Sequence, residues 1–220
     1  SFSKAIESFN FLKSIQVKHP NLSVSTITTY THYNQDTIFD IYSFIRNELQ
    51  PDSMSFPIVR GNPKESKSKD IDVSIYKVLL EKLHKSFFLE RNKEVVNHFG
   101  SPFIAAAKML SSELNIKIIE KMSYQTPCYA GILNAVIYEN GDIYPCELLS
   151  EKIGSLRDSN YDFQQIWFSE RADDVRKKIK DTRCFCYHGC NSINNVLFNP
   201  RFLSRILRNS LSLSLGNKNK

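Results

Sequence analysis

The side chains with the clearest capacity for chemistry are five cysteines, and none of them precedes residue 128. They are Cys128, Cys146, Cys184, Cys186 and Cys190. The first residues lack the pattern of a signal peptide, and an odd number of cysteines argues against a disulfide framework. Clustered thiols in a reducing compartment are instead typical ligands of zinc or of iron–sulfur clusters. We therefore expect a cytoplasmic protein with a metal centre in its C-terminal half.

A predicted β-hairpin would bring the first two cysteines together. Residues 132–138 and 142–146 are apolar runs on either side of an Asn140-Gly141 pair. Asn-Gly between apolar runs is typical of a tight hairpin turn, because that turn needs positive φ angles. Cys128 precedes the hairpin and Cys146 ends it, so the two thiols can approach at one end.

The other three cysteines form a compact C-x-C-x-x-x-C run between Cys184 and Cys190. A short loop of this kind can wrap several thiolates around one ion or cluster. Structural zinc sites prefer C-x-x-C knuckles, and this chain has none, although His188 could join a zinc site. Spacing alone leaves zinc and an iron–sulfur cluster close to each other, with the cluster slightly favoured.

A resemblance favours the cluster more strongly. The spacing C-x12-G-x4-C, formed by Cys128, Gly141 and Cys146, resembles the opening of the SPASM and twitch domains of radical S-adenosylmethionine enzymes. The surrounding sequence also resembles these domains: CYAGILNAVIYENGDIYPCELL is followed by IGSLRDSNYDFQQIW and CFCYHGC. The resemblance covers about 75 residues, from 125 to 200.

This resemblance implies one auxiliary [4Fe-4S] cluster, as in a twitch-like domain, because a full SPASM domain has more cysteines and two auxiliary clusters. Its ligands would be Cys128, Cys146 and Cys190, with either Cys184 or Cys186 as the fourth. The complete protein would bind S-adenosylmethionine on a second [4Fe-4S] cluster and would take electrons from a reductant such as flavodoxin or ferredoxin. Its substrate would be a peptide, a sugar or another small metabolite.

The N-terminal half predicts an α/β arrangement. Residues 3–18 and 36–49 have helical periodicity, whereas residues 22–31 and 54–60 are predicted strands. Helices that alternate with strands indicate a parallel sheet with crossover helices. The segment resembles the late strands of the partial, TIM-like barrel of the radical enzymes, and a small α+β cluster-binding domain with the hairpin would follow it.

Two polar residues follow the predicted strands and are candidate cofactor-binding residues. By resemblance, Asn34 would contact S-adenosylmethionine, and Arg60 would meet an anionic substrate or cofactor at the barrel mouth. The alternatives are structural: Asn34 can cap the next helix, and Arg60 can be a surface arginine.

We expect three regions along the chain. Residues 1–123 would hold the partial barrel and a helical extension, broken near Gly100. Residues 124–205 would form the cluster domain, with one helix over 161–180, and residues 206–220 would be a tail.

The chain has no C-x-x-x-C-x-x-C motif, which in the family binds the radical-generating cluster. We therefore expect a fragment that begins within the barrel and is inactive alone. Two other functions are open: a zinc-stabilised binding module and an electron-carrying module, both without catalysis of their own. The net charge of +6 is spread along the chain, so we expect no nucleic-acid partner, and no apolar run predicts a membrane span.

Overall fold

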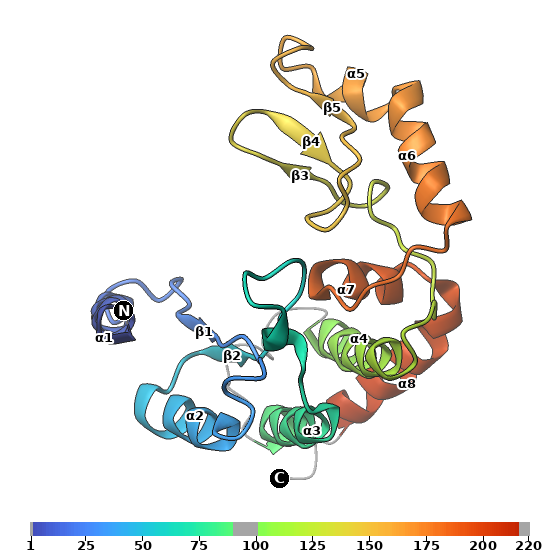
Figure 1. The fold of residues 1–220 in the computed structure, drawn as a ribbon. Helices are drawn as coiled ribbons and strands as arrows, with labels where there is room; N and C mark the ends of the chain where they lie inside the picture. The colour runs from blue at the N-terminus through green and yellow to red at the C-terminus, as the bar shows by residue number, and fades with distance from the viewer. Residues whose placement is uncertain (1, 90–100, 216–220) are drawn as a thin grey trace. The chain divides into compact units, whose positions relative to one another are not determined.

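The computed structural model describes residues 2–89 and 101–215, and the chain divides into two compact units, Ser1–Asn92 and Lys93–Lys220 (Figure 1). This division comes earlier than the predicted boundary after residue 123. The reason is that helix α4, Ser101–Lys121, packs on two later helices of the second unit. The predicted break near Gly100 lies outside the described residues.

The N-terminal unit contains a β–α–β element. The elements in order are α1 (Phe2–Gln16), β1 (Ser25–Ile27), α2 (Ile38–Phe44), a π-helical turn (Ile45–Leu49), β2 (Ser53–Ser55), a 3-10 turn (Ser66–Lys69) and α3 (Val73–Leu89). β1 and β2 pair in parallel, with Ser25 opposite Ser53, and an isolated bridge between Tyr30 and Ile58 extends the pairing. The predicted parallel pairing is therefore confirmed, with shorter strands.

No closed barrel exists in the described part of the chain. Its strands form one sheet of two strands and one of three, and eight α-helices accompany them. The mixed α/β class is confirmed, whereas the partial TIM-like barrel is not.

A pair of buried tyrosines lies at the centre of the N-terminal unit. The rings of Tyr30 and Tyr76 are 5.1 Å apart between centroids, and burial raises the pKa of each phenol to about 12. Their hydroxyls donate to the carbonyls of Asp72 and Phe56 at 2.8 and 2.9 Å. The pair thus joins the segments that follow β1 and β2 to the start of α3, with both tyrosine hydroxyls hydrogen-bonded.

Asp52, immediately before β2, ties α1 to the sheet. Its carboxylate accepts hydrogen bonds from Gln16 Nε2 at 2.7 Å and from the Val24 backbone, and it forms an ion pair with Lys13 at 3.3 Å. Burial acts to raise the pKa of Asp52, but these three donors outweigh it and hold the pKa below its ordinary value. The folded protein therefore favours the ionised form of Asp52.

Replacement of Asp52 by Asn should weaken the pH dependence of stability. A lowered folded-state pKa stabilises the protein above the unfolded value of about 3.9, and that contribution is lost as the pH falls through the folded value. We expect D52N to cost about 1–3 kcal/mol at pH 7 and much less at pH 3. Thermal unfolding followed by far-UV circular dichroism measures this, with exposed Asp70→Asn as the control. If the unfolding temperatures of D52N and wild type changed equally with pH, the prediction would be contradicted.

The C-terminal unit opens with the predicted hairpin, which is confirmed. β3 (Val136–Ile137) and β4 (Asp142–Tyr144) are antiparallel, and β5 (Gly154–Ser155) adds to the other edge of β4. Gly141 occupies the turn with a φ of +89°, and a Cβ there would lie 3.2 Å from Cγ of Arg157. Arg157 Nε donates to the Asn140 carbonyl at 2.7 Å, so the turn needs glycine both for its angle and for this contact.

The single helix predicted over 161–180 is wrong in one respect, because two helices occupy that range. α5 (Phe163–Trp167) ends before Ser169, and α6 (Glu170–Asp181) begins after it. The Ser169 hydroxyl accepts a hydrogen bond from the Ala172 backbone at 3.2 Å, which makes it the N-cap of α6.

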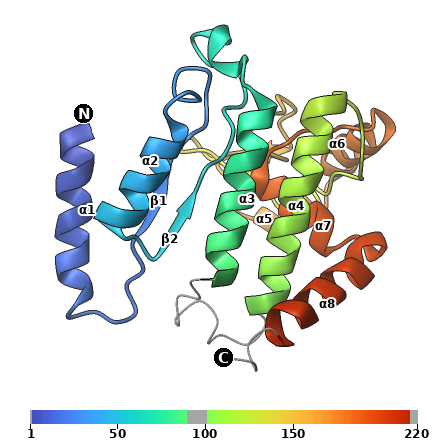
Figure 2. The ribbon, with the colours of Figure 1, turned by 90° about the horizontal axis from the view of Figure 1, so that it is seen from below.

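The predicted tail from residue 206 is also wrong within the described residues. α7 (Gly189–Leu197) is followed by α8 (Pro200–Leu215), and both pack on α4 (Figure 2). Ile206 of α8 is fully buried with Val196 of α7 and Ala106 of α4, and this burial stabilises the helix where a frayed end was expected.

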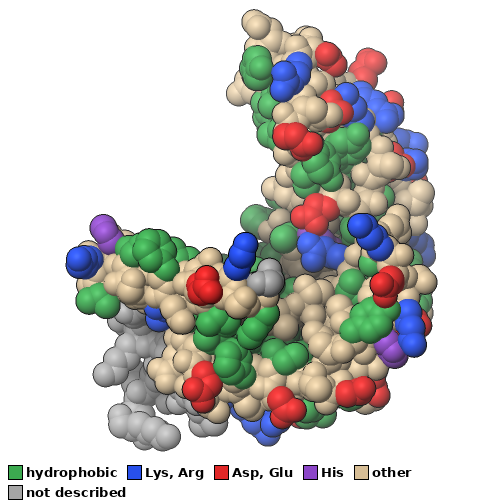
Figure 3. All heavy atoms as spheres, turned by 60° about the vertical axis from the view of Figure 1, so that its left-hand side comes forward, with side chains coloured by type: hydrophobic (Ala, Val, Ile, Leu, Met, Phe, Trp, Pro, Cys, Tyr) green, Lys and Arg blue, Asp and Glu red, His purple; other side chains and the backbone are tan. Residues whose placement is uncertain are grey.

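Basic and acidic side chains are interspersed on the face that Figure 3 presents. None of the helices formed by the described residues is both long enough and apolar enough to cross a membrane.

Candidate metal centre

Four of the five cysteines interact with one another. Cys184 donates a hydrogen bond to the Cys128 sulfur, and the charge on Cys128 and Cys146 is felt at both Cys184 and Cys186. The hairpin and the loop after α6 therefore meet, because Cys184 lies close enough to both Cys128 and Cys146 to sense their charge. Thiols from two distant segments of the chain lie in one group.

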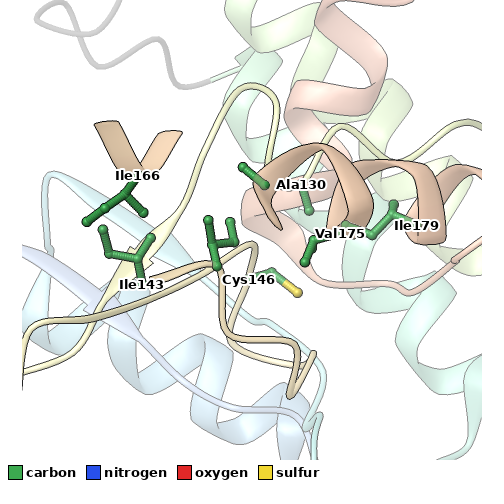
Figure 4. Close-up of a cluster of buried hydrophobic side chains, with 8 residues drawn as sticks. Ala130, Ile143, Cys146, Ile166, Val175 and Ile179 are labelled. Carbon is green, nitrogen blue, oxygen red and sulfur yellow. The ribbon is translucent and has the colours of Figure 1, made fainter. Parts of the chain in front are cut away.

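The group borders a core of aliphatic side chains. Cys146 is a buried member of this core (Figure 4). Cys128 and Cys184 pack against the same core. The figure labels Ala130, Ile143, Cys146, Ile166, Val175 and Ile179. An apolar wall of this kind limits access of water to a metal centre and influences its redox properties.

Cys128 and Cys184 each influence the pKa of the other. The Cys184 hydrogen bond is the main cause that lowers the pKa of Cys128, and the same bond, with burial, raises the pKa of Cys184. Burial also raises the pKa of Cys186. Cys128 is therefore more acidic than an ordinary cysteine, whereas Cys184 and Cys186 are less acidic.

Cys190 differs from the other four. It is exposed at the start of α7, and none of the interactions found for the four thiols within the described residues includes it. Its neighbour His188 is buried rather than facing solvent, and Nε2 lies 3.2 Å from a carboxylate oxygen of Glu147. Exposure to solvent therefore distinguishes Cys190 from the other four cysteines.

Two asparagines of α7 face the thiols, and the sequence analysis missed both. The Asn195 carboxamide is a hydrogen-bonding partner of Cys128, and the buried Asn191 carboxamide lies close enough to Cys186 to act against the rise of its pKa. They are four residues apart and therefore lie on one face of the helix. That spacing is the signal that could have identified them, but α7 itself was not predicted.

An arginine fixes the loop that follows Cys128, and it too was missed. Arg176 of α6 donates from Nε to the Gly131 carbonyl at 2.7 Å and from Nη2 to the Trp167 carbonyl at 2.6 Å. Its guanidinium also lies 4.8 Å from the centroid of the Trp167 ring. The two charge-assisted hydrogen bonds hold the Cys128 loop against α5 and α6.

The geometry of the thiol group is not that of a preformed mononuclear site. Across residues 2–89 and 101–215, no three Cys, His, Asp or Glu side chains are arranged so that they could hold a metal ion. Sulfur ligands around one zinc ion would lie about 4 Å apart, given Zn–S bonds of about 2.3 Å. In a four-iron cluster each thiolate binds a different iron, so a wider group of sulfurs is suitable.

The two candidate cofactor residues lie in the N-terminal unit. Asn34 follows β1, and its carboxamide accepts from the Thr31 backbone at 2.8 Å and donates to the Thr29 carbonyl at 2.9 Å. It closes its own turn and does not cap α2, whose first residue follows Thr37. Arg60 is half-buried shortly after the bridge to Ile58. A role of either residue in cofactor binding stays a prediction.

Comparison with known families decides what kind of domain surrounds the thiols. Residues 128–191 match the SPASM family, described as an iron–sulfur cluster-binding domain. This match lies within the C-terminal unit. No curated protein and no solved structure matches the chain. The SPASM match begins at Cys128 and ends at Asn191, so it includes all five cysteines and the first of the two asparagines, and the predicted resemblance is confirmed.

Proposed function

We propose that this SPASM domain binds one [4Fe-4S] cluster that serves as an auxiliary cluster in a radical S-adenosylmethionine enzyme. The observation that carries the proposal is the single group formed by thiols of the hairpin and of the loop after α6. The group fits the cofactor chemically, because it offers sulfur ligands, one stabilised thiolate and an apolar wall. When bound, such a cluster supplies one-electron redox chemistry.

The geometry favours Cys128, Cys146, Cys184 and Cys186 as the four ligands. Cys184 and Cys186 each sense the charge of Cys128 and Cys146, whereas Cys190 is exposed to solvent. This set differs from the sequence expectation, in which Cys190 was a ligand and only one of Cys184 and Cys186 was. The difference can be tested directly.

The N-terminal unit supports the wider assignment in a limited way. Its parallel β1 and β2, joined through α2, have the β–α–β connection from which barrels of this enzyme class are built. In the complete enzyme, S-adenosylmethionine on a second cluster would start the radical reaction, with flavodoxin or ferredoxin as the reductant. The substrate would be a peptide, a sugar or another small metabolite.

Anaerobic reconstitution of the full chain, followed by iron and sulfide analysis, tests the proposal. We expect about four irons and four sulfides per chain. One zinc per chain with no sulfide would support the zinc-stabilised module instead, and a cluster that exchanges electrons without any S-adenosylmethionine partner would support the electron-carrying module.

The ligand set is tested with single replacements of the cysteines that follow α6. Cys190→Ser should keep nearly all the iron, whereas Cys184→Ser and Cys186→Ser should each lose more than half of it, because each removes a thiolate from the group. The three variants replace sulfur by oxygen within one short segment and are therefore matched controls for one another. Loss of iron from Cys190→Ser, with full retention in one of the other two, would restore the ligand set expected from sequence.

A further inference from the structure

Helix α7 presents two buried carboxamides to the thiol group. Asn191 is 1% exposed and Asn195 is 6% exposed, although asparagine is usually a surface residue. A buried carboxamide costs free energy unless its donors and acceptor are satisfied, so the direction in which each amide faces is informative.

The orientation of Asn195 is fixed by a backbone contact. Its Oδ1 accepts a hydrogen bond from the Tyr129 backbone at 2.8 Å. Because the oxygen is committed to that N–H group, the NH2 group is the part of the amide that can donate to the sulfur of the adjacent Cys128.

The orientation of Asn191 is fixed through a second carboxamide. Asn134 Nδ2 donates to Asn191 Oδ1 at 2.9 Å and also approaches the Pro145 carbonyl at 3.4 Å. Rotation of either amide would set like groups against each other. The Asn191 NH2 group is buried without a well-formed hydrogen bond, and Cys186 is the group that its dipole stabilises. The Asn191 NH2 group is thus an unsatisfied donor beside the sulfur of Cys186.

We propose that Asn191 and Asn195 are positioning residues that donate N–H groups to the ligand sulfurs of Cys186 and Cys128 and thereby raise the reduction potential of the bound cluster. The inference rests on the proposed function. One-electron reduction by an external reductant breaks no bond and adds negative charge that the ligand sulfurs share. A donor aimed at those sulfurs stabilises the reduced state more than the oxidised state.

The substitutions Asn195→Asp and Asn191→Asp separate this role from packing. Each keeps the Oδ1 acceptor and the shape of the side chain, but an oxygen that cannot donate replaces the NH2 group. Asn194→Asp is the matched control for Asn195→Asp, since it adds the same charge to the same helix turn at a side chain that points about 100° away from that of Asn195.

The measurement is a potentiometric titration of the anaerobically reconstituted full chain, with dithionite as the reductant and the cluster followed by absorbance and electron paramagnetic resonance. We expect Asn195→Asp to make reduction at least tenfold less favourable, which is a fall of about 59 mV for one electron. Asn191→Asp should lower the potential in the same direction. Asn194→Asp should shift it by less than a third as much, and iron content should stay at the wild-type value in all three.

Each outcome decides the inference. Equal potentials for Asn194→Asp and Asn195→Asp would overturn it, and so would loss of iron from both proposed variants while the control keeps its iron, since that result would assign the asparagines a role in holding the domain together. A wild-type chain that binds no iron and sulfide would instead refute the proposed function on which the inference rests.

Discussion

Replacement of Cys146 by Val should reduce cluster uptake from about four irons per chain to less than a tenth of that amount. Cys146 is buried at the end of β4, where it joins the thiol group to the aliphatic core. Valine is similar in size to cysteine and keeps the apolar contact, so it removes the ligand sulfur while the packing changes little. Iron and sulfide analysis after anaerobic reconstitution provides the measurement.

Cys146→Ala completes this test, because it removes the ligand and also leaves a small cavity. Both variants should lose the cluster, and the fluorescence of Trp167, the single tryptophan, reports whether the surrounding domain is still folded. Wild-type iron content in Cys146→Val would remove Cys146 from the ligand set.

Replacement of Ile143 by Ala should destabilise the C-terminal unit by about 2–5 kcal/mol, the range for large-to-small changes in a core. Ile143 is 0% exposed in β4 and packs among the residues of Figure 4. The loss combines the burial of the deleted methyl and methylene groups with the cavity that they leave. Urea unfolding monitored by Trp167 fluorescence measures it, because Trp167 packs against the same core.

Ile137 provides the matched control for this prediction. It pairs with Ile143 across the two strands but is 52% exposed. We expect Ile137→Ala to cost less than about 1 kcal/mol, as is usual for surface positions. Equal losses from the two isoleucine variants would mean that the aliphatic core does not stabilise the hairpin.

The hairpin and the cysteines were readable from sequence because each depends on local chemistry. Asn140-Gly141 determines a turn through the φ angle that glycine adopts, and the residues on either side continue it. The spacing of the cysteines likewise indicates a metal centre, since few functions other than metal binding cluster thiols in one part of a chain. These two features sufficed to predict that Cys128 and Cys146 approach each other.

The helices after the last cysteine were not readable in the same way. α7 buries Asn191, Ser192 and Asn195 besides Val196, so much of its buried face is polar and its apolar periodicity is too short to predict a helix. α8 gains its stability from contact with α4, a segment far away in sequence. The exposure of Cys190 depends on where α7 begins, and for this reason the sequence could not distinguish Cys190 from the other cysteines.

The separation of the thiols along the chain has a consequence for biosynthesis. The two hairpin cysteines leave the ribosome first, and Cys184 follows only after β5, α5 and α6 have been made. A cluster held by all four would therefore be inserted after translation of the domain, by delivery to a largely folded chain. Once inserted, it would act as a cross-link that closes the connection 147–183, and it would limit the conformations open to that segment if the domain unfolded.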